Sequence, residues 1–76
     1  WALMELGADV NQANDYGTTP LFTAAEKGHE AIVRALIDFG ADVNKANNNG
    51  WTPLYMAARD RFHHSVIKIL TDAGAV

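Results

Sequence analysis

The stretch Gly17-Thr-Thr-Pro-Leu-Phe-Thr-Ala-Ala25 occurs a second time, 33 residues further along the chain, as Gly50-Trp-Thr-Pro-Leu-Tyr-Met-Ala-Ala58. The similarity extends beyond these two copies. When residues 1–28 are aligned with residues 34–61, 15 of the 28 pairs are identical, whereas unrelated sequences of ordinary composition share about two. A constant period of about 20 to 50 residues is typical of stacked structural repeats. The sequence therefore predicts a repeat array.

Each copy carries helix signals in the same order. Thr19 is expected to cap a first helix over residues 19–27, and Pro20 suits its first position because the missing N–H needs no partner there. Apolar residues at helical spacing predict a second helix over residues 30–39. Gly40 then ends the unit, since glycine adopts a left-handed conformation at low steric cost.

The 33-residue period and three sequence features together resemble the ankyrin repeat, in a register that covers essentially the whole chain. These features are Thr19-Pro20-Leu21, Gly28-His29 and Gly40-Ala-Asp-Val-Asn44. The resemblance implies an all-α fold, namely an ankyrin-repeat solenoid of stacked antiparallel helix pairs joined by extended β-hairpin-like loops.

We expect a single ankyrin-repeat domain. Its divisions are residues 1–16, the end of a truncated repeat and its loop; residues 17–49, a full repeat; and residues 50–76, a last repeat. The last repeat carries a one-residue insertion between Arg59 and His63, because Gly40 and Gly74 are 34 residues apart. Since the first residues align with the second half of a helix, we interpret the chain as a fragment of a longer array, natural or trimmed.

Composition narrows the classes of partner. Hydrophobic residues make up 49% and charged residues 20% of the chain, the net charge is −3, and cysteine is absent. The six lysines and arginines are scattered along the sequence, so we expect no nucleic-acid partner. No apolar run approaches the ~20 residues of a membrane span, so we expect no membrane partner. The lack of cysteine and of a targeting pattern fits a cytoplasmic location.

His63-His64 is the one cluster of candidate catalytic side chains in the sequence. Neighbouring residues of a helix point about 100° apart, so these imidazoles are poorly placed to chelate one metal ion. The resemblance implies that His29 and His63, which share a repeat position, hold a turn to its neighbour through hydrogen bonds. We therefore expect no enzyme, with no catalytic residue, no cofactor and no metal site. A metal site at His63 and His64 is the enzymatic alternative.

Residues that the fold requires are identical in the two copies. Positions that differ are free of this requirement, which makes them candidate contacts for another protein. The resemblance implies the same positions, because the loop tips and the concave face of the first helices form the recognition surface in ankyrin binders. The candidate partner-binding residues are Asp15, Tyr16, Thr18, Thr23, Glu26, Lys27, Asn48, Asn49, Trp51, Met56, Arg59 and Asp60. We therefore predict a non-catalytic protein–protein interaction module.

Trp51, Tyr16 and Met56 are the expected anchors, because aromatic and flexible apolar groups dominate binding energy when a partner buries them. The alternative interpretation is that Trp51 covers its own helix start and Tyr16 its own loop. Two other functions stay open. One is a structural spacer within a longer array, and the other is self-association through the truncated N-terminal flank.

Two further pairs of residues bear on the family pattern. Phe22 and Tyr55 stand where the family usually has a histidine that bonds the motif threonine, so we expect aromatic packing to replace that bond. Asn11 and Asn44 occupy a position that in the family can be a substrate of an asparaginyl hydroxylase. The other interpretation is that each asparagine bonds the loop backbone.

Overall fold

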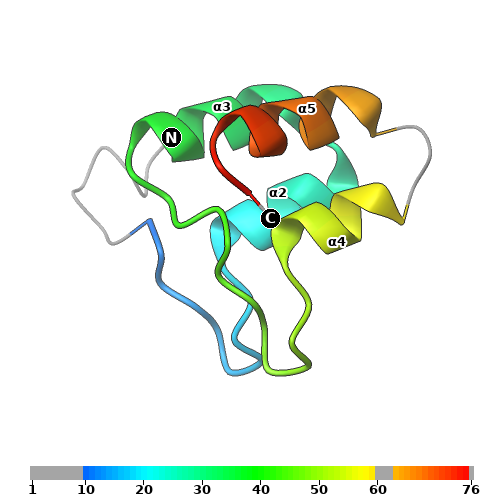
Figure 1. Cartoon of the computed structure of the whole chain (residues 1–76). Helices are drawn as coiled ribbons and strands as arrows, with labels where there is room; N and C mark the ends of the chain where they lie inside the picture. Colours follow the sequence, from blue (N-terminus) through cyan, green and yellow to red (C-terminus); the bar gives the residue numbers. More distant parts are fainter. Residues whose placement is uncertain (1–9, 60–62, 76) are drawn as a thin grey trace.

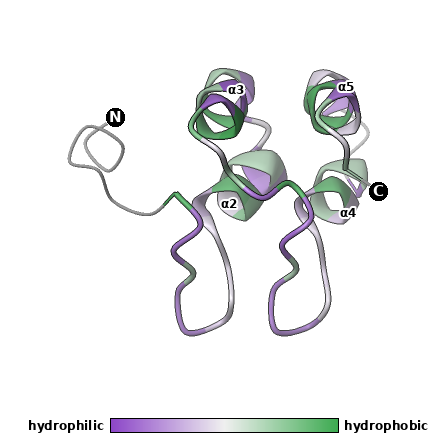
Figure 2. Cartoon of the chain, turned by 60° about the vertical axis from the view of Figure 1, so that its left-hand side comes forward, coloured by the Kyte–Doolittle hydropathy of each residue, from purple (hydrophilic) through white to green (hydrophobic). Residues whose placement is uncertain are grey.

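The computed structural model describes residues 10–59 and 63–75, and within these ranges it contains four helices and no strand (Figure 1). In chain order the helices are α2 (Pro20–Lys27), α3 (Glu30–Asp38), α4 (Pro53–Ala58) and α5 (His64–Asp72). The antiparallel pair α2–α3 stacks on the pair α4–α5, with α2 beside α4 and α3 beside α5. Figure 2 shows that the loops preceding α2 and α4 project to the same side of the stack. The expected all-α stack of helix pairs is confirmed.

Both first helices begin at the threonine–proline step. The Thr19 hydroxyl accepts a hydrogen bond from the Phe22 N–H at 3.2 Å, and the Thr52 hydroxyl accepts one from the Tyr55 N–H at 3.1 Å. Each bond satisfies an N–H group that the first turn of a helix leaves without a partner. A proline follows each threonine at the first helical position. The predicted helix starts are therefore correct.

Gly28 ends α2 with a φ of +72°, in the left-handed region. Its N–H donates to the Ala25 carbonyl at 3.2 Å, and the His29 N–H donates to the Ala24 carbonyl at 2.9 Å. These bonds satisfy carbonyl groups of the last helical turn. Because the turn is so short, α3 starts immediately and runs back along α2.

The corresponding turn of the second pair differs. Helix α4 has six residues where α2 has eight, and Arg59 after it keeps a right-handed conformation with a φ of −68°. Residues 60–62, which include the region of the inserted residue, lie outside the described ranges. Across the stack, the His63 ring packs against Gly28, since a Cβ at position 28 would lie 2.5 Å from the His63 Cδ2 and Nε2 atoms. His63 thus contacts the neighbouring pair at its turn.

The core lies between the two pairs. Ala24, Ala25 and Ala57 are 4%, 0% and 0% exposed, and their small side chains let α2 and α4 approach closely. Larger aliphatic side chains from α2, α3, α5 and the loops fill the remaining space: Val10, Leu21, Val33, Leu36, Val66 and Leu70 are buried, and Val43 packs against them. Val10 and Val43, which are 33 residues apart, therefore both tie their loops to the stack.

The extended loops are bonded from one repeat to the next. The Asn11 Oδ1 atom accepts a hydrogen bond from the Asp42 N–H at 2.7 Å, and the Asn44 side chain donates to the Gly74 carbonyl at 3.5 Å. Both contacts agree with the interpretation that these asparagines bond the loop backbone.

At the loop tips, Asn48 joins the second loop to the first. Its N–H donates to the Tyr16 carbonyl at 2.9 Å, and its side-chain amide donates to the Asp15 carbonyl at 3.0 Å. The tips also touch at Gly17, where a Cβ would lie 2.5 Å from the Asn48 Oδ1 atom. The loops are therefore part of the stack rather than separate appendages.

Gly28→Ala is expected to destabilise the chain more than Gly40→Ala. Both glycines have positive φ angles, +72° and +94°, so either alanine carries a left-handed strain of about 1–2 kcal/mol. At position 28 the new Cβ also meets His63, whereas at position 40 it has no described atom within 4 Å. The measurement is the free energy of unfolding in urea. Equal losses in the two variants would contradict the packing of His63 on Gly28.

Asn48→Ala is expected to lower the free energy of unfolding by about 0.5–1.5 kcal/mol, because the Asp15 carbonyl loses its side-chain donor. Asn49→Ala, at the next exposed position, is the matched control and should stay within about 0.5 kcal/mol of the parent chain. Urea titrations of the three proteins give the comparison. If both variants lose the same amount, the bond between the tips is not what stabilises the loops.

Candidate functional site

The same local structure presents Tyr16 and Trp51 at the two loop tips. The Asn14 side-chain oxygen accepts hydrogen bonds from the N–H groups of Tyr16 at 2.9 Å and Thr18 at 3.1 Å. In the second loop, the Asn47 side-chain oxygen accepts one from the Trp51 N–H at 3.0 Å. Asparagine side chains that bond nearby backbone in this way stabilise a tight turn. Each loop therefore has a hydrogen-bonded turn at the backbone that carries its aromatic residue.

Tyr16 is 74% exposed at the tip of the first loop. A ring with this exposure does not cover its own loop, so the structure disfavours the alternative interpretation of this residue. Its backbone carbonyl accepts the hydrogen bond from Asn48, while its side chain stands free of the stack. The Tyr16 ring is available to a second molecule.

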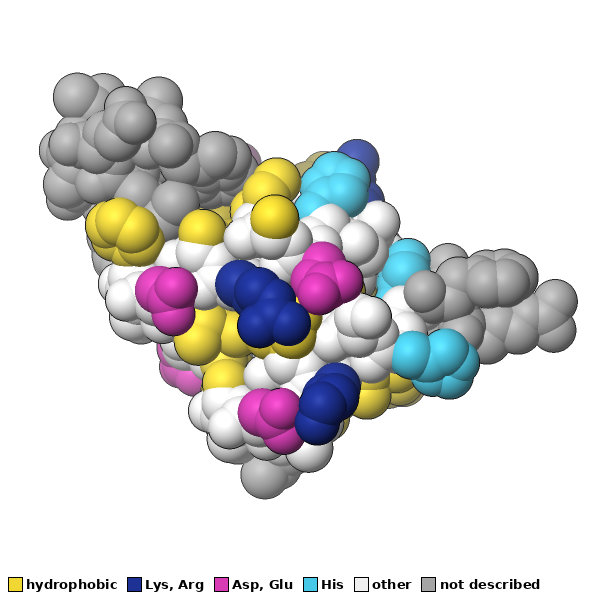
Figure 3. All heavy atoms as spheres, turned by 90° about the horizontal axis from the view of Figure 1, so that it is seen from above, with side chains coloured by type: hydrophobic (Ala, Val, Ile, Leu, Met, Phe, Trp, Pro, Cys, Tyr) yellow, Lys and Arg dark blue, Asp and Glu magenta, His cyan; other side chains and the backbone are white. Residues whose placement is uncertain are grey.

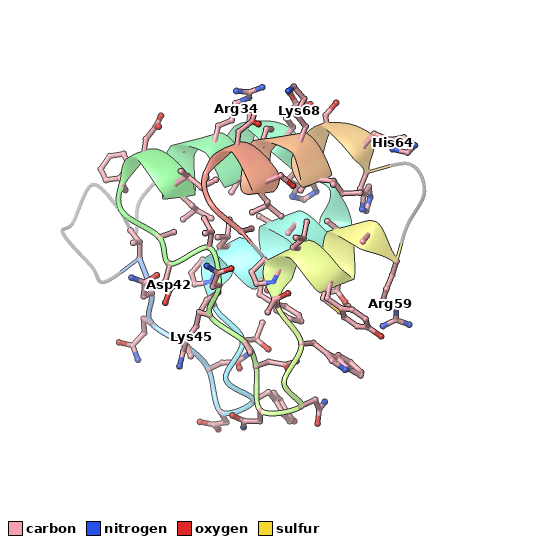
Figure 4. All side chains as sticks on the ribbon, in the orientation of Figure 1. Arg34, Asp42, Lys45, Arg59, His64 and Lys68 are labelled. Atoms are coloured by element: carbon pink, nitrogen blue, oxygen red, sulfur yellow. The ribbon has the colours of Figure 1, made fainter. Side chains whose placement is uncertain are left out.

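Trp51, Tyr55 and Arg59 form an exposed group along α4, which we call the aromatic cluster. The ring centroids of Trp51 and Tyr55 are 5.9 Å apart with their planes at 34°, and the Arg59 guanidinium carbon lies 5.6 Å from the Trp51 ring centroid. Trp51 precedes the N-cap Thr52, Tyr55 lies within α4, and Arg59 directly follows its last residue. Figure 4 shows Arg59 pointing away from the helices. The cluster combines an aromatic pair with a cation–π contact.

Trp51 makes local contacts and is also partly exposed. It packs on Tyr55 and Arg59, which is local cover, and the residue still leaves 37% of its surface in water. The local contacts hold the indole in place without hiding it. A partner could therefore meet an ordered ring.

Tyr55 is an exposed aromatic residue that the sequence prediction missed. It is 49% exposed, whereas Phe22 at the same repeat position is 4% exposed. Phe22 is covered because α4 packs on α2, and no described helix follows α4 in the same way. The sequence gives no local signal for this difference, because Phe22 and Tyr55 share the same repeat position.

The expectation that Met56 is an exposed anchor is wrong. Met56 is 7% exposed, and its sulfur accepts a contact from the Arg59 Nη1 atom at 3.9 Å. It lies on α4, which packs against α2, and a flexible apolar side chain can fill an irregular gap of this kind. Met56 is therefore a buried side chain that contacts Arg59, whereas Thr23 at the same repeat position is exposed.

The other predicted contacts are mostly at the surface. Asp15, Thr23, Glu26, Lys27, Asn48 and Asn49 are exposed, Thr18 is half-buried, and Asp60 lies outside the described ranges. The side-chain amide of Asn48 is committed to the Asp15 carbonyl. Glu26 and Arg59 do not pair with each other. Within residues 10–59 and 63–75 the ion pairs are Arg34–Glu30 and Lys68–Asp72, each at 3.4 Å.

The outer face of α3 and α5 is a different kind of surface. Seen from above in Figure 3, acidic and basic side chains stand over apolar ones. A hollow of about 390 Å³ between the two helices is lined by Ile37, Ile69 and the charged residues of both ion pairs. Exposed ion pairs of this type contribute little free energy. The aromatic cluster lies on the other helical layer, on α4.

Few side chains of the kinds that bind metals or catalyse reactions lie close together among the described residues. No three histidine, aspartate or glutamate side chains among them are placed to hold a metal ion, and His63 and His64 join no such group. None of the described helices has the length and apolar character needed to cross a membrane. The features with the clearest chemical character are the exposed aromatic and arginine side chains.

Comparisons with known proteins agree with this geometry. A comparison with curated proteins finds no match. A family model for ankyrin repeats in three copies matches residues 1–76, the whole length of the chain. Members of this family are generally protein–protein interaction modules and are generally not enzymes. The chain belongs to the ankyrin-repeat family.

Proposed function

We propose that this chain is a non-catalytic protein-binding module that holds its partner with the loop tips and the first-helix face. The observation that carries the proposal is the aromatic cluster, in which Trp51, Tyr55 and Arg59 lie exposed side by side. Tryptophan, tyrosine and arginine are the residues most enriched among those that dominate interface energies. Covering the rings with a partner removes apolar surface from water, which is favourable in proportion to the area buried.

The loops support this proposal because they are ordered in the absence of a partner. Asn14 and Asn47 fix the two turns, and Asn48 bonds the tips to each other. Ordering a mobile side chain on binding costs about 0.5–1.5 kcal/mol, and a surface that is already fixed avoids part of this cost. Tyr16 and Trp51 therefore belong to neighbouring parts of one preorganised surface.

The polar residues around these rings form the rim of the proposed face. The exposed members are Asp15, Glu26, Lys27 and Asn49, with Thr18 half-buried beside them. Charges at a rim act mainly on the rate of association and on specificity. Asp60 stays in the proposal as a position that the described residues do not include. Thr23, which is exposed on α2, also stays in the proposal. Met56 is left out because it is buried.

Trp51→Ala is expected to weaken partner binding about tenfold or more, because a buried aromatic anchor contributes about 2 kcal/mol or more to an interface. The partner is first captured on the immobilised chain from a cell extract and identified, and each variant is then titrated with the purified partner by calorimetry. Tyr16→Ala should also weaken binding, by a smaller factor.

The matched control is Phe39→Ala, which removes a ring that is 59% exposed at the end of α3, outside the proposed face. This variant should bind with unchanged affinity. Wild-type affinity in Trp51→Ala and Tyr16→Ala would show that the partner uses another surface. Failure of the chain to capture any protein would favour the spacer function instead.

A further inference from the structure

Asn49, at the tip of the second loop, differs from the other asparagines of the chain. The Asn49 side chain makes no hydrogen bond with a residue that the structure describes, and only its backbone N–H is bonded, to the Asn47 Oδ1 atom at 3.0 Å. Asn49 is also exposed. The other five asparagines have side chains that bond to backbone groups: Asn11, Asn14, Asn44, Asn47 and Asn48. The Asn49 amide is thus the one that local bonding leaves open to water within residues 10–59 and 63–75.

Gly50 follows this amide in the chain, and it leaves the surroundings of its backbone nitrogen open. Gly50 is exposed with a φ of +81°, and a Cβ at this position would meet no described atom within 4 Å. Glycine has no side chain to hinder the approach of the Asn49 side-chain carbon to the Gly50 nitrogen. Each of the other asparagines is followed by a residue with a side chain. Asn49 therefore combines an uncommitted amide with an unhindered neighbour.

We propose that Asn49 is a site of spontaneous deamidation. The Gly50 backbone nitrogen attacks the Asn49 Cγ atom, which forms a new C–N bond and closes a five-membered succinimide ring. The Asn49 side-chain nitrogen takes up the proton of the Gly50 N–H and leaves as ammonia. Water then opens the ring. Hydrolysis of the new Cγ–N bond leaves aspartate, and hydrolysis of the original peptide C–N bond leaves isoaspartate, whose main chain runs through the former side chain.

The folded turn holds this reaction back. The Gly50 N–H donates to the Asn47 carbonyl at 2.9 Å, and the Asn48 side chain bonds the tip to the Asp15 carbonyl at 3.0 Å. A nitrogen fixed in this way is not free to reach the Asn49 Cγ atom, so the tip has to open first. Loops open locally at a lower cost in free energy than the core does. The rate of deamidation in the folded chain is therefore set by how often the loop tip opens.

Isoaspartate at position 49 changes the turn that carries Trp51. The Asn47 Oδ1 atom accepts hydrogen bonds from the N–H groups of Asn49 and Trp51, both at 3.0 Å. Isoaspartate adds one carbon atom to the main chain between these two N–H groups, so the two bonds lose their shared geometry. Aspartate keeps the original main chain and adds only a negative charge. The isoaspartate form therefore has a looser turn at Trp51, and any effect of this on recognition rests on the function proposed above.

Mass spectrometry of the purified chain, aged in mildly alkaline buffer, tests whether Asn49 is the site. Trypsin cleaves after Lys45 and Arg59, and fragmentation of the resulting peptide distinguishes its three asparagines. The conversion of an amide to a carboxyl group should appear first at Asn49. A sample kept unfolded in urea shows that the incubation is long enough. Deamidation that begins at another asparagine, or a folded chain that stays unmodified while the urea sample converts, would overturn the proposal.

Asn48→Ala tests the control by the turn. This variant loses the side-chain bond between the tips, so deamidation of Asn49 in the folded chain should accelerate about two- to tenfold, the range expected for one lost hydrogen bond. In urea the parent and the variant should react at equal rates, which checks the chemical effect of the altered neighbour. Equal rates in the folded chains as well would contradict the requirement for opening of the tip.

Hydrogen exchange at the Trp51 amide tests the consequence for the turn, without the need for a binding partner. The isoaspartate form, separated by chromatography, should lose about two- to tenfold of the protection of this amide once intrinsic exchange rates are corrected. Asn49→Asp is the matched control, because it carries the charge without the added main-chain carbon, and it should keep the parent protection. Unchanged protection in the isoaspartate form would overturn the proposed loosening. Failure of the proposed binding function would appear separately, as unchanged partner affinity in Trp51→Ala.

Discussion

The packing of one helix pair on the next is the interaction on which the rest of this structure depends. The helices have six to nine residues each, and helices of this length are unstable alone in water. Their stability comes from burial. Leu36 and Leu70 are 0% exposed in the shared core, and covering such a side chain is worth about 1.5–3 kcal/mol. Ala24 and Ala57 make the close approach of α2 and α4 possible, because larger side chains there would separate the pairs.

Because the core between the helix pairs stabilises the chain, other parts of the chain are available for recognition. The frame residues stabilise the stack, so the tips and the outer side of α4 contribute little to the core. These parts can therefore carry exposed aromatic residues that the core does not require, such as Tyr16 and Trp51. The Asn14 and Asn47 side-chain oxygens accept hydrogen bonds from the backbone N–H groups of these two residues, which stabilises the turns that carry the rings.

Features that depend on neighbouring residues in the sequence were predictable. The threonine–proline starts and the glycine at the end of α2 are local signals, and the 33-residue period located the second copy of each start. Contacts between the repeats were not predictable in the same way. Variation between copies does not separate a position that faces solvent from one that faces the adjacent pair, which is why Met56 was misassigned. Tyr55 was missed for a related reason, since its exposure depends on whether a further pair covers it.

Native-state hydrogen exchange in Leu70→Ala tests most directly whether the two pairs stabilise each other. If neither pair folds without its neighbour, the substitution in α5 should lower the exchange free energy of the slowest amides in α3 by the same amount as in α5. Amides of α3 that keep their original protection, while those of α5 lose theirs, would contradict this account. They would show that the first pair folds on its own and that stacking is not what holds the chain together.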